Sequence, residues 1–184
     1  MEIGSIFTKG LTLFTLFGNA FVVALILLYF LARPIYERVM RFMSDHALTL
    51  GLFFSASSTI GSIIYSEVVG FPACILCWMQ RIFMYPMMFL FGMGLFRKER
   101  NIIPYAMMLA IIGGVVAFYQ WSKDMLALYS SINIPCPAVS SLPSCDKIYV
   151  LEYGYITIPM IALNAFILIT IIMYAALRAQ KHDN

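Results

Sequence analysis

The four cysteines of the chain form two close pairs, Cys74-Ile-Leu-Cys77 and Cys136 with Cys145. Both pairs lie in breaks between long apolar runs, where we expect the chain to meet a membrane surface. Neighbouring thiols of this kind can exchange electrons by passing between dithiol and disulfide forms. Because the chain has few other reactive side chains, the sequence indicates redox chemistry carried by cysteines.

The first pair has a helical setting that suits this chemistry. Pro72 is expected to end the preceding helix, which places Cys77 near the N-terminus of the next one. Arg81 follows four residues later, on the same helix face and one turn deeper. A helix N-terminus and a guanidinium both favour a thiolate, so we expect Cys77 to be the better nucleophile of the pair. The alternative is that Arg81 only reaches back to the lipid headgroups.

The second pair lies in the long polar connection Ser122–Gly154. Its first part, Lys123–Ile132, has one mostly apolar side and predicts a short helix lying on the membrane surface. Three prolines within 134–145 exclude a helix around Cys136 and Cys145. Such a loop suits a disulfide that is presented to a partner protein, and the alternative is a static bridge that pins the loop.

The composition requires a lipid environment. The chain has 184 residues, of which 62% are hydrophobic and only 11% are charged, and its mean hydropathy is +0.88. Soluble domains carry about 25% charged residues. The net charge of +3 is small and scattered, which argues against a nucleic-acid partner.

Five apolar segments are long enough to cross a bilayer as helices. A β-barrel would instead show short alternating segments. The sequence therefore predicts an all-α polytopic membrane protein. The first segment is too long for a secretory signal and is followed by Arg33 and Pro34, so we interpret it as a retained helix. The five segments are Leu11–Ala32, Ala47–Gly70, Trp78–Phe96, Pro104–Trp121 and Tyr155–Leu177.

The basic residues predict the orientation. Eight of the 12 lysines and arginines fall on one side of the predicted bundle, which we therefore expect to be cytoplasmic. All four cysteines then face the oxidising side, where disulfides persist. The eight are Arg33, Arg38, Arg41, Arg97, Lys98, Arg100, Arg178 and Lys181, whereas Lys9, Arg81, Lys123 and Lys147 lie on the other side.

The motif around the first pair resembles the signature of the disulfide bond formation protein B family (DsbB), and most closely its BdbC-like branch. The motif runs Cys74-Ile-Leu-Cys77-Trp78-Met79-Gln80-Arg81-Ile82 and continues with Met84-Tyr85-Pro86. The stretch Tyr153-Gly154-Tyr155-Ile156-Thr157-Ile158-Pro159 is similar to the start of the last helix in that family. The resemblance covers about Ala47 to Leu177. It implies a four-helix thiol oxidoreductase core at 47–177, an additional N-terminal helix with a cytoplasmic connection at 1–46, and a cytoplasmic tail at 178–184.

The resemblance also implies an activity, which is that of a quinone-dependent protein-disulfide oxidoreductase in the bacterial cytoplasmic (inner) membrane. Such an enzyme reoxidises a thioredoxin-fold, DsbA-like thiol oxidase outside the cytoplasm and passes the electrons to ubiquinone or menaquinone, and so indirectly to the respiratory chain.

The same resemblance assigns roles to individual residues. It implies disulfides Cys74–Cys77 and Cys136–Cys145, with Cys77 meeting the quinone beside Arg81 and with Cys136 forming the mixed disulfide with the partner. Trp78 is close enough in sequence to Cys77 to line the quinone pocket.

Three features depart from the family pattern: the additional first helix, the short spacing between Cys136 and Cys145, and Gln120 where the BdbC-like branch is expected to have a histidine. Other classes fit less well. A zinc site would need four free thiolates at an irregular spacing in an oxidising compartment. A vitamin K epoxide reductase-like enzyme shares the two pairs and the quinone, but not the arginine and proline context. A non-catalytic protein with two structural disulfides is the remaining alternative.

Overall fold

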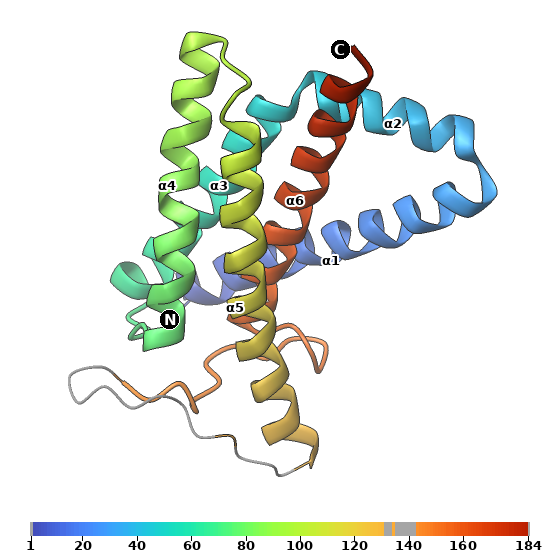
Figure 1. Ribbon diagram of the computed structural model, residues 1–184. Coiled ribbons are helices and arrows are strands. Elements are labelled where there is room, and N and C mark those ends of the chain that lie inside the picture. The colour runs from blue at the N-terminus through green and yellow to red at the C-terminus, as the bar shows by residue number, and fades with distance from the viewer. Residues whose placement is uncertain (1, 131–133, 135–142, 184) are drawn as a thin grey trace.

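In the computed structural model, residues 2–130, 134 and 143–183 are described, and these residues form helices with short connections as far as residue 130 and a longer loop before the last helix (Figure 1). The predicted all-α membrane fold is confirmed, because five of the helices are long and apolar enough to cross a membrane. The helices are α1 (Glu2–Leu31), α2 (Arg33–Asp45), α3 (Ala47–Ile63), the π-helix η1 (Ile64–Val68), α4 (Ile75–Arg97), α5 (Ile103–Ser130) and α6 (Ile158–Asp183).

Helices α3, α4, α5 and α6 form a four-helix bundle in which each helix packs against two neighbours. Its centre holds large apolar side chains that are fully buried, among them Met87, Phe91 and Phe166. Two glycines permit the close packing. An added Cβ at Gly51 would overlap the ring of Phe91, and one at Gly113 would overlap the ring of Phe166. Small residues at such crossings allow helix backbones to approach closely in a membrane.

Helix α1 lies outside this ring and contacts mainly α6 and α2. Its C-terminal half runs obliquely away from the bundle, and α2 then returns to the end of α6 (Figure 1). Phe30 and Leu31 are accordingly exposed, as suits side chains that face lipid.

Helix α2 corrects the prediction that residues 33–46 are only a connection. The segment is an amphipathic helix that buries Met40 and Met43 and exposes Arg38 and Arg41. A helix with one apolar and one basic face suits the membrane interface. Its Glu37 forms an ion pair with Arg178 of α6, in which Arg178 Nη2 lies 3.0 Å from Glu37 Oε1.

Helix α5 corrects a second prediction. The segment from Lys123 onward is not a separate surface helix, because α5 continues without a break to Ser130. Its last turns extend past the bundle toward the loop that leads to α6 (Figure 1).

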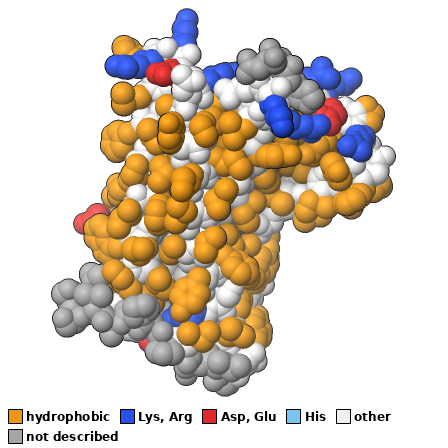
Figure 2. Space-filling view, viewed as in Figure 1, with side chains coloured by type: hydrophobic (Ala, Val, Ile, Leu, Met, Phe, Trp, Pro, Cys, Tyr) orange, Lys and Arg blue, Asp and Glu red, His pale blue; other side chains and the backbone are white. Residues whose placement is uncertain are grey.

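The two ends of the bundle differ in charge. Lysine and arginine side chains gather at the end where α4 meets α5 and where α6 finishes (Figure 2). Arg100, in the turn between α4 and α5, donates to the carbonyl oxygens of Ser44 and Asp45 at 3.3 Å each, which joins this turn to the end of α2. The thiols lie at the opposite end of α4.

Candidate functional site

The first cysteine pair sits at the start of α4. Cys74 has extended backbone angles at the N-cap position, and its carbonyl oxygen accepts the first helical hydrogen bond, from the backbone N–H of Trp78. Cys77 lies in the first turn. The two Sγ atoms are 3.1 Å apart, and both residues are free thiols. The pair is therefore in its dithiol form, at a separation that favours disulfide formation. The predicted Cys74–Cys77 disulfide stays a prediction for the oxidised form.

Cys74 is the member of the pair that keeps its proton. Its hydrogen bond with Cys77, and then its burial, raise the pKa of Cys74 above the ordinary value for a thiol. A protonated Cys74 can donate its S–H to the Sγ of Cys77. The sequence prediction that Cys77 is the better nucleophile is consistent with this arrangement.

Two glutamines complete the polar contacts of the pair. Gln120 of α5 is buried, and its Nε2 donates to Cys74 Sγ at 3.6 Å and to Cys77 Sγ at 3.7 Å. Gln80 of α4 donates through Nε2 to Gln120 Oε1 at 2.8 Å, which fixes the orientation of the Gln120 amide. Both sulfurs therefore receive a hydrogen bond from a side chain that is itself held in place.

Arg81 lies one turn beyond Cys77, as the spacing predicts. Its Nε donates to Ser62 Oγ at 2.9 Å and its Nη2 donates to the Ser62 carbonyl oxygen at 3.0 Å. Its guanidinium carbon lies 5.1 Å from the centre of the Trp78 ring, a cation–π contact. Among the described residues Arg81 makes no ion pair, so its positive charge is not neutralised by a carboxylate.

The second pair approaches the first through Cys145. Cys145 is buried, is disulfide-bonded, and shares one apolar cluster with Cys74 and Leu76. Cys136 lies outside the described residues, so its predicted roles stay predictions.

Helix α5 anchors the loop of Cys145. The buried Lys123 donates through Nζ to the Cys145 carbonyl oxygen at 3.0 Å and to Asp146 Oδ1 at 2.8 Å. The hydrogen bond from Lys123, followed by one from Ser144, lowers the pKa of Asp146 below its usual range. Asp124, the next residue of α5, is also buried.

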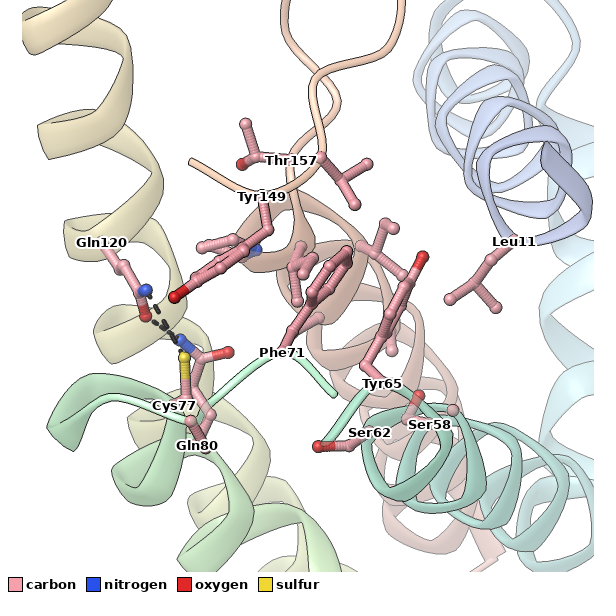
Figure 3. A pocket seen from close by; sticks show the side chains of 18 of the residues that line it. Leu11, Ser58, Ser62, Tyr65, Phe71, Cys77, Gln80, Gln120, Tyr149 and Thr157 are labelled. Carbon is pink, nitrogen blue, oxygen red and sulfur yellow. Dashed lines mark hydrogen bonds between the residues drawn. The ribbon is translucent and has the colours of Figure 1, made fainter. Parts of the chain in front are cut away.

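A cavity of about 470 Å³ adjoins the thiols. Residues from α1, α3, η1, α4, α5, α6 and the loop before α6 line it, and most of them are apolar. Cys77, Gln80 and Gln120 stand on one side and Leu11 on the other, with Phe71 and Tyr65 between them (Figure 3). Arg81 and Asp124 also line the cavity. This volume lies within the range typical of sites for small organic molecules.

A sequence model of the family described as "Disulfide bond formation protein DsbB" matches residues 44–178. The chain belongs to this family. It is 37% identical over 124 residues to "Disulfide bond formation protein C" of Bacillus subtilis, a match that covers 67% of this chain and 86% of the relative. It is 32% identical over 134 residues to "Probable disulfide formation protein C 1" of Bacillus cereus, covering 73% and 94%. A "Probable disulfide formation protein" of Coxiella burnetii is 30% identical over 138 residues, covering 75% and 92%. No solved structure matches the chain.

This membership confirms the resemblance expected from the cysteine motif. The chain is thus a multi-pass membrane protein of the DsbB family, and the family is one of membrane disulfide oxidoreductases that act with a thiol–disulfide oxidase partner. The family match begins at residue 44. Helix α1 and nearly all of α2 therefore precede the matched residues.

The residues that the structure brings together at the candidate site differ from the site residues predicted from the sequence. Cys74, Cys77 and Arg81 come together at one side of the cavity, whereas Trp78 is not among the residues that line it and instead packs against Arg81. Sequence reasoning assigned no role at the site to Gln80 and treated Gln120 only as a departure from the family. One feature of the sequence could have pointed to Gln120. It is a polar residue near the end of an apolar run, and two charged residues, Lys123 and Asp124, follow it within about one helical turn.

Proposed function

We propose that this protein is a quinone-dependent oxidase of protein thiols, which reoxidises a thioredoxin-fold, DsbA-like partner outside the cytoplasm. The observation that carries the proposal is that the dithiol of Cys74 and Cys77 lies between another cysteine and a cavity. It shares a buried apolar cluster with the disulfide-bonded Cys145, and it lines an apolar cavity that also holds Arg81. A relay between a protein disulfide and a lipid-soluble oxidant needs both contacts.

The cavity fits a quinone by its chemistry. Its walls are mainly apolar and aromatic, which suits a flat conjugated ring with a prenyl tail. Quinone carbonyl oxygens accept hydrogen bonds, and several donors line the cavity. Among them are the Arg81 guanidinium and Thr157 Oγ1, which is buried and makes no hydrogen bond to a described residue.

The relay proceeds through thiol–disulfide exchange. A partner dithiol attacks the loop disulfide, and the partner leaves as a disulfide while the loop becomes a dithiol. The loop dithiol then reduces a Cys74–Cys77 disulfide and is itself reoxidised. Each exchange transfers two electrons and two protons.

The residues around the dithiol prepare it to be oxidised. Gln120 donates to both sulfurs, and Cys74 retains a proton that it can donate to Cys77. A bound quinone supplies the acceptor for two electrons and two protons. Arg81 stabilises negative charge at the cavity wall by the electrostatic effect of a fixed cation in an apolar site.

The test uses the purified protein in lipid nanodiscs, with a reduced DsbA-like partner and either ubiquinone or menaquinone. We expect one quinone to be reduced for each partner disulfide formed, as followed by quinone absorbance and by thiol titration. Cys77→Ala and Cys145→Ala should each stop the coupled reaction. Partner oxidation that continues without quinone consumption would contradict the proposal.

The basic end of the bundle is proposed to lie in the cytoplasm, because basic residues flank transmembrane helices mainly on that side. Single cysteines at two exposed positions, Lys98→Cys and Tyr153→Cys, can test this in a background without the native cysteines. An impermeant maleimide applied to intact cells should label position 153 and not position 98. The reverse labelling would overturn the orientation and the function with it.

A further inference from the structure

Helix α1 contributes one wall of the cavity although it precedes the residues matched by the DsbB family. The lining residues recur at helical spacing on one face of its first half. They are Ile6, Phe7, Gly10, Leu11 and Phe14. The wall is therefore a continuous helix face, supplied by the part of this chain that the family pattern does not contain.

Specific polar contacts hold α1 in place against the bundle. Asn164 of α6 is buried and donates to Asn19 Oδ1 at 2.7 Å. Gly18 permits the approach, since an added Cβ there would overlap the side chain of Asn164. Nearer the thiols, the hydroxyl of Tyr65 donates to Thr8 Oγ1 at 3.3 Å. These contacts fix the register of α1 and so determine which of its faces lines the cavity.

An aromatic row runs from α1 across the cavity. The ring of Phe7 meets Tyr65 edge-on at 5.3 Å between centroids. Tyr65 stacks on Phe71 at 5.9 Å, and Phe71 stacks on Tyr149 at 4.8 Å. All four rings line the cavity, and Figure 3 shows the last three side by side. Four separate segments therefore supply one aromatic surface, and α1 provides its first member.

We propose that the face of α1 from Ile6 to Phe14 is part of the quinone site in this protein and helps to determine which prenylated quinone binds. This inference rests on the proposed quinone-dependent function. Phe7 and Leu11 supply apolar contact to the ring or the first prenyl unit. Gly10 supplies space, because it lines the cavity and an added Cβ there meets no atom within 4 Å.

Gly10→Leu tests the proposal because it places a side chain in this space without forcing a backbone clash. Gly92→Leu is the matched control, since Gly92 also lies within a helix, also has nothing within 4 Å of an added Cβ, and does not line the cavity. Binding of ubiquinone and of menaquinone to the protein in nanodiscs is measured directly, by quenching of tryptophan fluorescence. Because the leucine side chain would occupy space that the quinone needs, Gly10→Leu should weaken binding of at least one quinone by about tenfold, which corresponds to about 1.4 kcal/mol. Gly92→Leu should bind as the wild type does.

A second pair of variants guards against misfolding. Phe7→Ala removes a wall residue, whereas Phe17→Ala removes an exposed ring of the same helix that does not line the cavity. We expect Phe7→Ala to weaken quinone binding and Phe17→Ala to bind quinone as the wild type does, with thermal unfolding of both variants checking that each is folded.

The outcomes separate the two proposals. If the wild type binds neither quinone, the proposed function fails. If the wild type binds quinone and both Gly10→Leu and Phe7→Ala bind it equally well, the function stands and the role of α1 is overturned.

Discussion

Gln120 offers the sharpest test of the thiol site, because among the described residues it is the one side chain outside the pair that hydrogen-bonds both sulfurs. Gln120→Leu keeps a similar volume and removes the N–H donor. The N···S distances of 3.6 and 3.7 Å indicate modest bonds that are shared between two acceptors. We therefore take the lower end of the range for a hydrogen bond to a charged group, about 1.5 kcal/mol. Loss of that stabilisation lowers the fraction of Cys77 that is a thiolate, so at a pH where the thiol form prevails it should slow alkylation of Cys77 by about tenfold.

The assay is alkylation of the protein by iodoacetamide with the loop disulfide intact, followed by mass spectrometry of the peptide that contains Cys77. Tyr119→Leu is the control, since Tyr119 is the adjacent residue of α5, is exposed, and does not line the cavity. We expect the control to react at the wild-type rate. An unchanged rate in Gln120→Leu would refute the reasoning that this amide stabilises the thiolate.

The same substitution has a separate effect on stability, which can be corrected. Gln120→Leu leaves Gln80 Nε2 buried without the acceptor that it now has at 2.8 Å, at a cost of about 1–3 kcal/mol. Gln80→Leu combined with Gln120→Leu removes both partners and should recover most of the lost thermal stability. The double variant should still react about tenfold more slowly, because it also lacks the donor to sulfur. If the double variant recovers both its thermal stability and the wild-type alkylation rate of Cys77, the slow reaction of Gln120→Leu came from misfolding.

Three further predictions concern the charges and the loop. Arg81→Met should raise the KM for quinone about tenfold or more while disulfide exchange with the partner keeps its rate, and unchanged quinone kinetics would leave Arg81 as a headgroup ligand only. Cys145→Ala should trap a mixed disulfide between Cys136 and the partner on a non-reducing gel, and its absence would refute the assignment of the loop pair. Lys123→Met should release the loop and increase its cleavage by a protease. Because the pKa of Asp146 is lower in the folded than in the unfolded chain, its contribution to anchoring is complete above about pH 4 and is lost as the pH falls through the lowered value. Proteolysis by an acid-active protease should therefore increase with acidity in the wild type and be insensitive to pH in Lys123→Met.

The local part of the site could be predicted from the sequence, because it depends on spacing along one helix. Cys74, Cys77 and Arg81 fall within two turns of α4, so their proximity follows from helix geometry alone. The contacts of Gln120 could not be derived in this way. They depend on how α4 and α5 pack, which places residues 43 and 46 positions apart in hydrogen-bond contact.

The prediction of α5 failed for a physical reason that the structure identifies. Lys123 and Asp124 follow an apolar run, and charged residues there usually mark the end of a transmembrane helix. Both are buried, and for Lys123 the reason is visible: its ammonium is satisfied by the Cys145 carbonyl oxygen and by Asp146 from a distant loop. For α2, by contrast, the signal was present in the sequence. Tyr36, Val39 and Met43 recur at helical spacing among basic residues, a pattern typical of an interfacial helix.

The length of α5 couples the two halves of the redox site. Gln120 holds the dithiol, and Lys123, less than one turn later, holds the loop at Cys145. The other end of the loop is tied to the same helix, because Trp121 Nε1 donates to the Tyr155 carbonyl oxygen at 3.0 Å and the Tyr129 hydroxyl donates to that of Gly154 at 2.7 Å. A helix that ended at Trp121 would keep Gln120 and lose both Lys123 and Tyr129. The added turns therefore hold the loop of Cys145 close to Cys74, as the proposed relay requires.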